Sequence, residues 1–150
     1  MQISEIMTRH PRTVTPDASV SDAAQVMKEE DVGIVPVVEQ PGGAETRARL
    51  VGVVTDRDIA IRHVAGGRTG DGPVRDIMSG GVRTCSPDDT VADVLRLMGS
   101  EQIRRIPVID ARGSLVGMVS QADLARKADD ARAVERTVAE ISQPGGAHQT

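Results

Sequence analysis

With 150 residues, of which 39% are apolar, the chain is long enough for one ordinary domain or two very small ones with a packed core. The sequence contains no Phe, Tyr or Trp, so this core must be aliphatic. The net charge of −4 and the lack of aromatic side chains that could stack on bases argue against nucleic-acid binding.

The chain contains two copies of one unit, whose segments match in the same order. The matching segments are 3–27 with 74–98, 33–38 with 104–109, and 50–60 with 115–125. Equivalent residues are 107 − 36 = 71 positions apart at the prolines, but 117 − 52 = 65 apart at the glycines. The first copy therefore has a loop six residues longer, which we expect at the surface.

Each copy begins with a short extended segment that ends at Pro16 or Pro87 and is followed by a helix. The helix start has a capping-box pattern, SVSD in the first copy and TVAD in the second. From Val20 and Val91, apolar residues recur at i, i+3, i+4 and i+7, which is the spacing of a half-buried helix.

Two β-rich runs joined by a glycine-containing loop come next and predict a β-hairpin in each copy. The runs are 34–38 and 51–54 in the first copy, and 106–109 and 116–119 in the second. A second helix begins at Thr55 or Ser120, so each unit is β-α-β-β-α. Because a unit of about fifty to sixty residues has a marginal core by itself, we expect the copies to pack around a cleft on their pseudo-twofold axis.

After the second copy, residues 129–141 place apolar side chains at helical spacing, and Asp129 and Asp130 lie where helix N-terminal acids belong. We expect an extra helix packed on the module, with a dimer or partner contact as the alternative. The predicted organisation is a first motif at 3–65, a linker at 66–73, a second motif at 74–128, a C-terminal helix at 129–142 and a disordered tail at 143–150.

The doubled set of motifs resembles the cystathionine β-synthase (CBS) domain family over residues 3–128. The resemblance is carried by GVVTDRD and GMVSQAD, by the VPV and IPV strands, and by the IM…T-x-x-P segment that opens each copy. Among stand-alone members, the strings TDRDI and IRRIPVI are similar to the actinobacterial hypoxic-response type. The family implies an α/β (α+β) fold in which two β-α-β-β-α motifs form one pseudo-symmetric Bateman module.

The hydroxyl and carboxylate at the start of each second helix, Thr55 with Asp58 and Ser120 with Asp123, allow two interpretations. As a capping-box variant they stabilise the helix by about 1 kcal/mol. As a binding site, the hydroxyl and the helix N–H groups attract phosphate, and the carboxylate accepts hydrogen bonds from two ribose hydroxyls. The resemblance implies the second role, and the residues alone leave both open.

Arg104 and Arg105 precede the proline of the second copy, where the family often supplies cations to phosphate. Because adjacent strand residues point to opposite faces, we expect one arginine to face the cleft and the other solvent. Ordinary surface arginines are the alternative. The first copy has Gly33 and Ile34 instead, which predicts two unequal sites with the charge supplied by the second copy. Arg57 is a further candidate for binding phosphate, and the alternative is that it is simply exposed to solvent.

The resemblance also implies that an adenine nucleotide binds in the central cleft. Because the chain has no aromatic side chains, its base would be held by aliphatic walls and backbone groups. The candidate residues are Ile34, Val35, Pro36, Ile106 and Pro107, with Thr13 and Thr84 on the opening strands. For the two threonines the alternative, which we favour, is simple β-propensity.

The sequence predicts neither catalysis nor a metal site. His10, His63 and His148 lack a carboxylate or cysteine at a suggestive spacing, and the phosphate-loop, nucleophile-elbow and metal-ligand motifs are absent. The single cysteine, Cys85, excludes an intramolecular disulfide, fits a reducing compartment and is expected to be buried and inert. With no stretch resembling a signal peptide or membrane span, we expect a cytoplasmic protein without a membrane partner.

From the resemblance we therefore expect a regulatory module rather than an enzyme. It would sense an adenine nucleotide (AMP, ADP or ATP), or S-adenosylmethionine instead, in the cleft between its two copies, and would require no cofactor. The family also implies a homodimer and a regulated protein on which the module acts in trans. The alternative is a ligand-free scaffold that works by dimerisation or by docking a partner.

Overall fold

The structure, a computed structural model, describes residues 1–40 and 47–142, with side chains up to Arg132. The first copy contains η1 (Ile3–Glu5), β1 (Thr8–Arg9), α1 (Val20–Glu30), β2 (Ile34–Glu39), β3 (Arg49–Thr55), α2 (Asp56–Asp58) and η2 (Ile59–Val64). The second contains η3 (Val74–Asp76), α3 (Val91–Glu101), β4 (Arg105–Ile109), β5 (Leu115–Ser120) and α4 (Gln121–Ser142). η1 and η3 are 3₁₀-helices and η2 is a π-helix. The predicted disordered tail lies outside the described residues.

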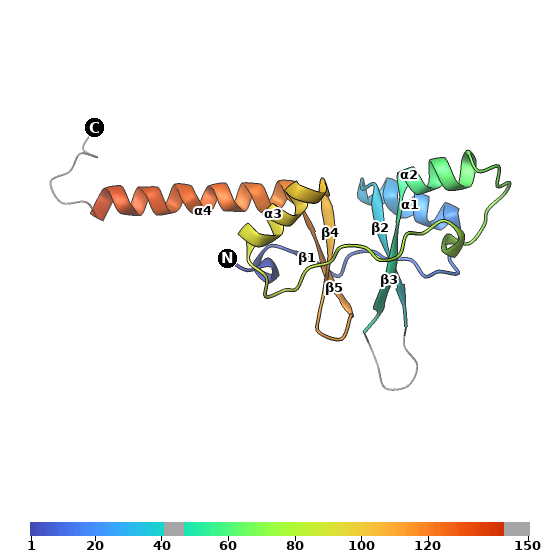
Figure 1. The fold of residues 1–150 in the computed structure, drawn as a ribbon, viewed down its shortest axis with the longest axis horizontal. Coiled ribbons are helices and arrows are strands. Elements are labelled where there is room, and N and C mark those ends of the chain that lie inside the picture. The colour runs from blue at the N-terminus through green and yellow to red at the C-terminus, as the bar shows by residue number, and fades with distance from the viewer. Residues whose placement is uncertain (41–46, 143–150) are drawn as a thin grey trace.

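Two antiparallel hairpins, β2–β3 and β4–β5, form the centre of the molecule, and both confirm the sequence prediction. They stand side by side in Figure 1, with β2 and β4 running in the same direction, away from the end at which helices α1 to α4 are gathered. The hairpins are joined directly, because the Leu50 N–H donates to the Gly113 carbonyl at 3.1 Å and the Leu115 N–H donates to the Ala48 carbonyl at 3.0 Å. Equivalent strands therefore meet at the pseudo-twofold axis.

The segment that opens each copy packs on the other copy. The Ser4 N–H donates to the Pro87 carbonyl at 2.9 Å, and Thr8 of β1 is the register partner of Met118 in β5. In the same way, the Arg75 N–H donates to the Pro16 carbonyl at 3.0 Å, and Ser79 bridges to β3. This exchange interlocks the copies, so neither is complete without the other.

Two aliphatic cores lie one under each hairpin, and each contains residues of both copies. The core of the first hairpin contains Val14, Val20, Ala23, Val26, Met27, Val35, Val37 and Val54 together with Val74 and Ile77 from the second copy. The core of the second hairpin contains Cys85, Val91, Val94, Met98, Ile106, Val108, Val119 and Leu124 together with Ile3 and Met7 from the first copy. The cores thus hold the exchanged segments in place.

The last helix differs from the sequence expectation. Instead of a separate helix at 129–142 packed on the module, α4 runs without a break from Gln121 to Ser142, and its C-terminal half extends away from both hairpins (Figure 1). The physical reason is that this stretch contains neither glycine nor proline, and ion pairs one turn apart, such as Asp123 with Arg126, support it. Within residues 1–40 and 47–142, no helix has the length and apolar character needed to cross a membrane.

Candidate ligand-binding site

The start of α4 lies where β5 ends, and two hydrogen bonds fix its position. The Ser120 Oγ accepts a hydrogen bond from the Asp123 N–H at 3.1 Å, which is the predicted capping interaction. The Gln121 N–H donates to the Arg104 carbonyl at 2.7 Å. The chain that enters β4 is therefore held against the first turn of α4, which brings Arg104 close to that turn.

A groove of about 990 Å³ runs between the two copies at this end of the hairpins. From the second copy it is lined by Leu95, Ile103, Arg104, Arg105, Ser120, Gln121, Ala122 and Ala125, and from the first by Gly33, Ile34 and Asp56. Its volume lies at the upper end of the range of about 300–1,000 Å³ that is typical of small-molecule sites. The repeat predicts a cleft between the copies, and this groove occupies that place.

A narrower groove of about 110 Å³ adjoins the first, because Ile34, Arg105 and Ser120 line both. Its other lining residues are Thr8, Pro11, Arg12, Val26, Glu30, Val32, Pro36, Met118, Val119 and Asp123. We refer to the two together as the joined grooves. They combine guanidinium groups, hydroxyls and carboxylates with an aliphatic wall, which is the chemistry that a sugar phosphate with an apolar substituent requires.

The three arginines of the joined grooves differ in their partners. Arg12 pairs with Glu29 and, at 3.6 Å, with Glu30, and its hydrogen bond lowers the pKa of the Glu29 carboxyl. Arg104 and Arg105 are exposed, and neither guanidinium forms an ion pair with any residue that the structure describes. The second copy therefore presents two cations that can bind an anion without first breaking an ion pair.

Both Arg104 and Arg105 line the larger groove, whereas the sequence predicts only one of them there. Alternation between faces applies within a strand, and β4 begins at Arg105. Arg104 belongs to the preceding turn, so alternation does not direct it away from the groove.

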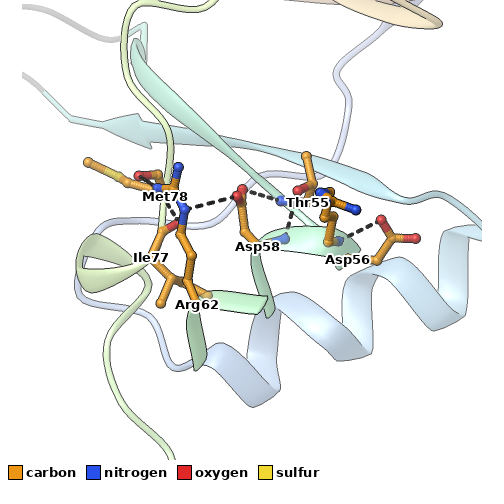
Figure 2. A network of polar contacts seen from close by, with 7 residues as sticks. Thr55, Asp56, Asp58, Arg62, Ile77 and Met78 are labelled. Carbon is orange, nitrogen blue, oxygen red and sulfur yellow. Dashed lines mark hydrogen bonds and ion pairs between the residues drawn. The ribbon is translucent and has the colours of Figure 1, made fainter. Parts of the chain in front are cut away.

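The first copy uses its equivalent residues differently, as Figure 2 shows. The Thr55 N–H donates to the Asp58 carboxylate at 3.0 Å, and the Asp58 N–H donates to the Thr55 hydroxyl at 3.0 Å, which completes a capping box. Arg62 Nε lies 3.6 Å from the other carboxylate oxygen of Asp58. Neither Thr55 nor Asp58 lines the joined grooves, and Arg57 is exposed outside them.

Five other candidates also lie outside the joined grooves. Val35 and Ile106 are 1% and 0% exposed and belong to the two cores, because their neighbours Ile34 and Arg105 face the grooves and alternate strand residues point to opposite faces. Pro107 is buried. Thr13 and Thr84 line two separate hollows near the hairpin loops. Of the proposed aliphatic wall, Ile34 and Pro36 line the joined grooves.

Sequence reasoning missed Thr8 and Arg12, which line the narrower groove. They belong to the first copy, but the pairing of β1 with β5 carries their segment onto the second. The sequence offers no signal of that exchange, since the opening segment is as compatible with its own hairpin. Asp56 and Gln121, which follow the capping residues, also line the larger groove and were not singled out.

Two interlocked β-α-β-β-α motifs with a groove between them define a module of two paired motifs. The chain matches the family model of the CBS domain over residues 3–63 and 74–130, and it therefore belongs to the CBS-domain family. This confirms the tandem pair inferred from the repeated motifs. Proteins with such pairs generally serve as regulatory modules.

Curated relatives extend over most of the chain. The CBS domain-containing protein YhcV of Bacillus subtilis is 41% identical over 123 residues, which are 82% of each chain. Hypoxic response protein 1 of Mycobacterium tuberculosis is 31% identical over 123 residues, or 81% of each chain, in keeping with the noted resemblance.

A structure of Hypoxic Response Protein I contains two coordinated zinc ions. In the described part of this chain, no group of His, Cys, Asp and Glu is placed to hold a metal.

Two solved structures with similar folds contain adenosine ligands. The CBS domain pair of MJ0100, in complex with 5′-methylthioadenosine and S-adenosyl-L-methionine, has a TM-score of 0.73 at 26% identity and covers 87% of this chain and 98% of its own. CBSX2 of Arabidopsis thaliana in complex with AMP has a TM-score of 0.72 at 27% identity, with the same coverage.

Proposed function

We propose that this chain is a regulatory module that binds an adenine nucleotide, such as AMP, ADP or ATP, in the joined grooves. The observation that carries the proposal is that Ile34, Arg105 and Ser120 line both grooves, so that one ligand can contact a cation, a hydroxyl and an aliphatic surface together. The ligands of the CBSX2 and MJ0100 structures support an adenosine compound. S-adenosylmethionine is the second ligand to test.

Each part of such a ligand has a matching group. Arg104 and Arg105 suit the phosphates, because guanidinium binds phosphate oxygens bidentately. Ser120 and the N-terminal turn of α4, a helix of 22 residues, add hydrogen-bond donors and the positive end of the helix dipole. The Asp123 carboxylate can accept hydrogen bonds from both ribose hydroxyls. Ile34 lines the same groove and offers an apolar surface for the base.

The regulatory step follows from the position of the grooves between the copies. A ligand that contacts Ile34 of the first copy and Ser120 of the second favours those arrangements of the hairpins in which both contacts are made. In this proposal the change is passed to a partner protein. The ligand can shift the equilibrium only by the difference between its affinities for the two arrangements.

The lack of Tyr and Trp provides the test. The chain itself absorbs very little in the adenine band, so a co-purified nucleotide dominates the ultraviolet spectrum of a fresh preparation. After removal of bound ligand, AMP, ADP, ATP and S-adenosylmethionine are added separately, and the ligand that binds raises Tm by roughly 5–10 °C at about 100 times its Kd. A flat spectrum together with unchanged Tm for all four ligands contradicts nucleotide binding and favours the ligand-free scaffold.

One observation favours assembly as a further part of the function. Ile61 and Val64 of η2 are 52% and 67% exposed, which is unusual for two large apolar side chains on one helical turn. We propose that they contact a second copy of the chain in a homodimer. Sedimentation equilibrium is expected to show a dimer that dissociates in the variant Ile61→Ser/Val64→Ser. A monomeric wild-type chain contradicts this part of the proposal.

A further inference from the structure

The fold contains a second position equivalent to the Ser120 end of the joined grooves. Applying the repeat offsets of 65 and 71 residues, Ser120 and Asp123 correspond to Thr55 and Asp58, and Thr8 corresponds to Ser79. The backbone is equivalent too, because Thr8 is the register partner of Met118 and Ser79 bridges to Val53. On backbone geometry alone, a module of this kind could therefore bind two ligands.

The side chain of Arg62 enters the equivalent position in the first copy. Its Nη1 lies 3.4 Å from the carbonyl oxygens of both Ile77 and Met78, and its Nε lies 3.6 Å from the Asp58 carboxylate (Figure 2). Each of these contacts is long, but together they link the second helix of the first copy to the opening segment of the second. The residue equivalent to Arg62 is Lys127, which is exposed on α4.

Because of Arg62, the carboxylate of Asp58 differs from that of its equivalent, Asp123, in its hydrogen-bond partners and in its exposure. One oxygen of Asp58 accepts from the Thr55 N–H, the other faces Arg62, and the side chain is only 11% exposed. The Asp123 side chain is 43% exposed and pairs with Arg126, itself 64% exposed, at 2.8 Å. An ion pair between exposed groups is weak, so a ribose can displace Arg126 from Asp123 at little cost. At Asp58 a ribose must displace both the guanidinium and the capping bond.

The residue after each hydroxyl adds to the difference. Asp56 follows Thr55 and lines the larger groove, whereas Gln121 follows Ser120 at the equivalent place. A phosphate at the start of α2 meets the Asp56 carboxylate, while a phosphate at the start of α4 meets a neutral amide. The repulsion between like charges disfavours the first position.

We propose that Arg62 acts as a built-in occupant of the Thr55–Asp58 position, so that each chain binds one adenosine ligand, at Ser120 and Asp123, instead of two. This inference rests on the proposed function and specifies it further. It makes Arg62 a residue that sets the number of sites, without contact with the bound ligand.

The test is titration calorimetry with the tightest binder among AMP, ADP, ATP and S-adenosylmethionine. Wild type is expected to bind one ligand per chain. Arg62→Ala is expected to bind two, and Arg62→Ala/Asp56→Gln to bind the second more tightly. Lys127→Ala, the matched control, is expected to remain at one. Arg62 is 53% exposed, so its removal is compatible with folding, which a cooperative thermal transition checks.

The outcomes separate the two proposals. Two ligands per wild-type chain, or one ligand per chain in both Arg62 variants, overturns the role of Arg62 while leaving nucleotide binding intact. Wild type that binds none of the four ligands overturns the proposed function, and this inference with it.

Discussion

Arg105 and Ser120 are register partners across β4 and β5, and both line each of the joined grooves. The equivalent partners across β2 and β3 are Ile34 and Thr55. A cation therefore lies opposite the capping hydroxyl only in the second copy. This difference places a group suited to phosphate in the second copy, and it is one reason why we assign the phosphate end of the ligand to that copy.

Replacing Arg105 with the residue of the first copy, Arg105→Ile, is expected to weaken AMP binding by roughly 10–100-fold. A hydrogen bond to a charged group contributes about 1.5–3 kcal/mol, which corresponds to that range. Because Arg105 is exposed, Tm without ligand is expected to change little. Calorimetry measures the affinity, and Arg96→Ala on α3, which removes an arginine outside the joined grooves, is the control. Equal losses in the two variants contradict a specific role for Arg105.

Replacing the carboxylate by an amide is expected to change ligand affinity at Asp123 but protein stability at its equivalent, Asp58. Asp123→Asn is expected to weaken nucleotide binding at least roughly tenfold with little loss of stability, because its side chain is 43% exposed. Asp58→Asn is expected to reduce the free energy of unfolding by about 1–2 kcal/mol, since it weakens a buried capping box, and to leave the affinity unchanged. Urea denaturation and calorimetry on both variants give the comparison. If Asp58→Asn abolishes binding, the Thr55–Asp58 position of the first copy takes part in the site, which contradicts its placement outside the joined grooves.

Local patterns predicted the elements well, because their causes lie in neighbouring residues. The capping hydroxyls Ser19, Thr55, Thr90 and Ser120 all accept the predicted hydrogen bond from the N–H three residues on. Both hairpins also lie where apolar runs predict them. Here the nearest neighbours in sequence are the neighbours in space, so the pattern contains the needed information.

The lining of the joined grooves was predicted only in part, because it depends on contacts between distant segments. Ile34, Pro36, Arg104, Arg105, Ser120 and Asp123 line the joined grooves as proposed. Thr8 and Arg12 were missed because the exchange of opening segments leaves no periodic signal. Val35 was among the candidates for holding the base because the composition of a strand does not indicate which of its faces meets the groove and which meets the core. The long-range contact between Arg62 and the segment at Ile77 was equally invisible.

The thiol of Cys85 is expected to be inert in the folded chain. Burial and, secondarily, the charge of Asp89 raise its pKa from 9.0 to about 12. The pKa of the Cys85 thiol is therefore higher in the folded chain than in the unfolded chain. Its contribution to the free energy of unfolding is complete below about pH 9 and is lost as the pH rises towards 12. At about pH 8, a thiol reagent is expected to react at least roughly tenfold faster in denaturing urea than without it. Rapid reaction of the native chain contradicts this burial.

The exchange of opening segments can be tested at Gly52, where β3 passes Ser79 of the second copy. A Cβ at Gly52 would lie 2.6 Å from the Ser79 carbonyl oxygen, and that oxygen belongs to backbone held by its bond to the Val53 N–H at 3.0 Å. Gly52→Ala is therefore expected to reduce the free energy of unfolding by about 1–3 kcal/mol, because the segment must move away from β3.

The matched control for this change is Gly99 in α3, where an added Cβ meets no atom within 4 Å. Gly99→Ala is expected to increase the free energy of unfolding by about 0.5–1 kcal/mol, since alanine loses less conformational freedom in a helix. Urea denaturation of both variants measures the difference. If Gly52→Ala is as stable as the wild type, the segment around Ser79 does not lie against β3, and the interlocking of the two copies is contradicted at that point.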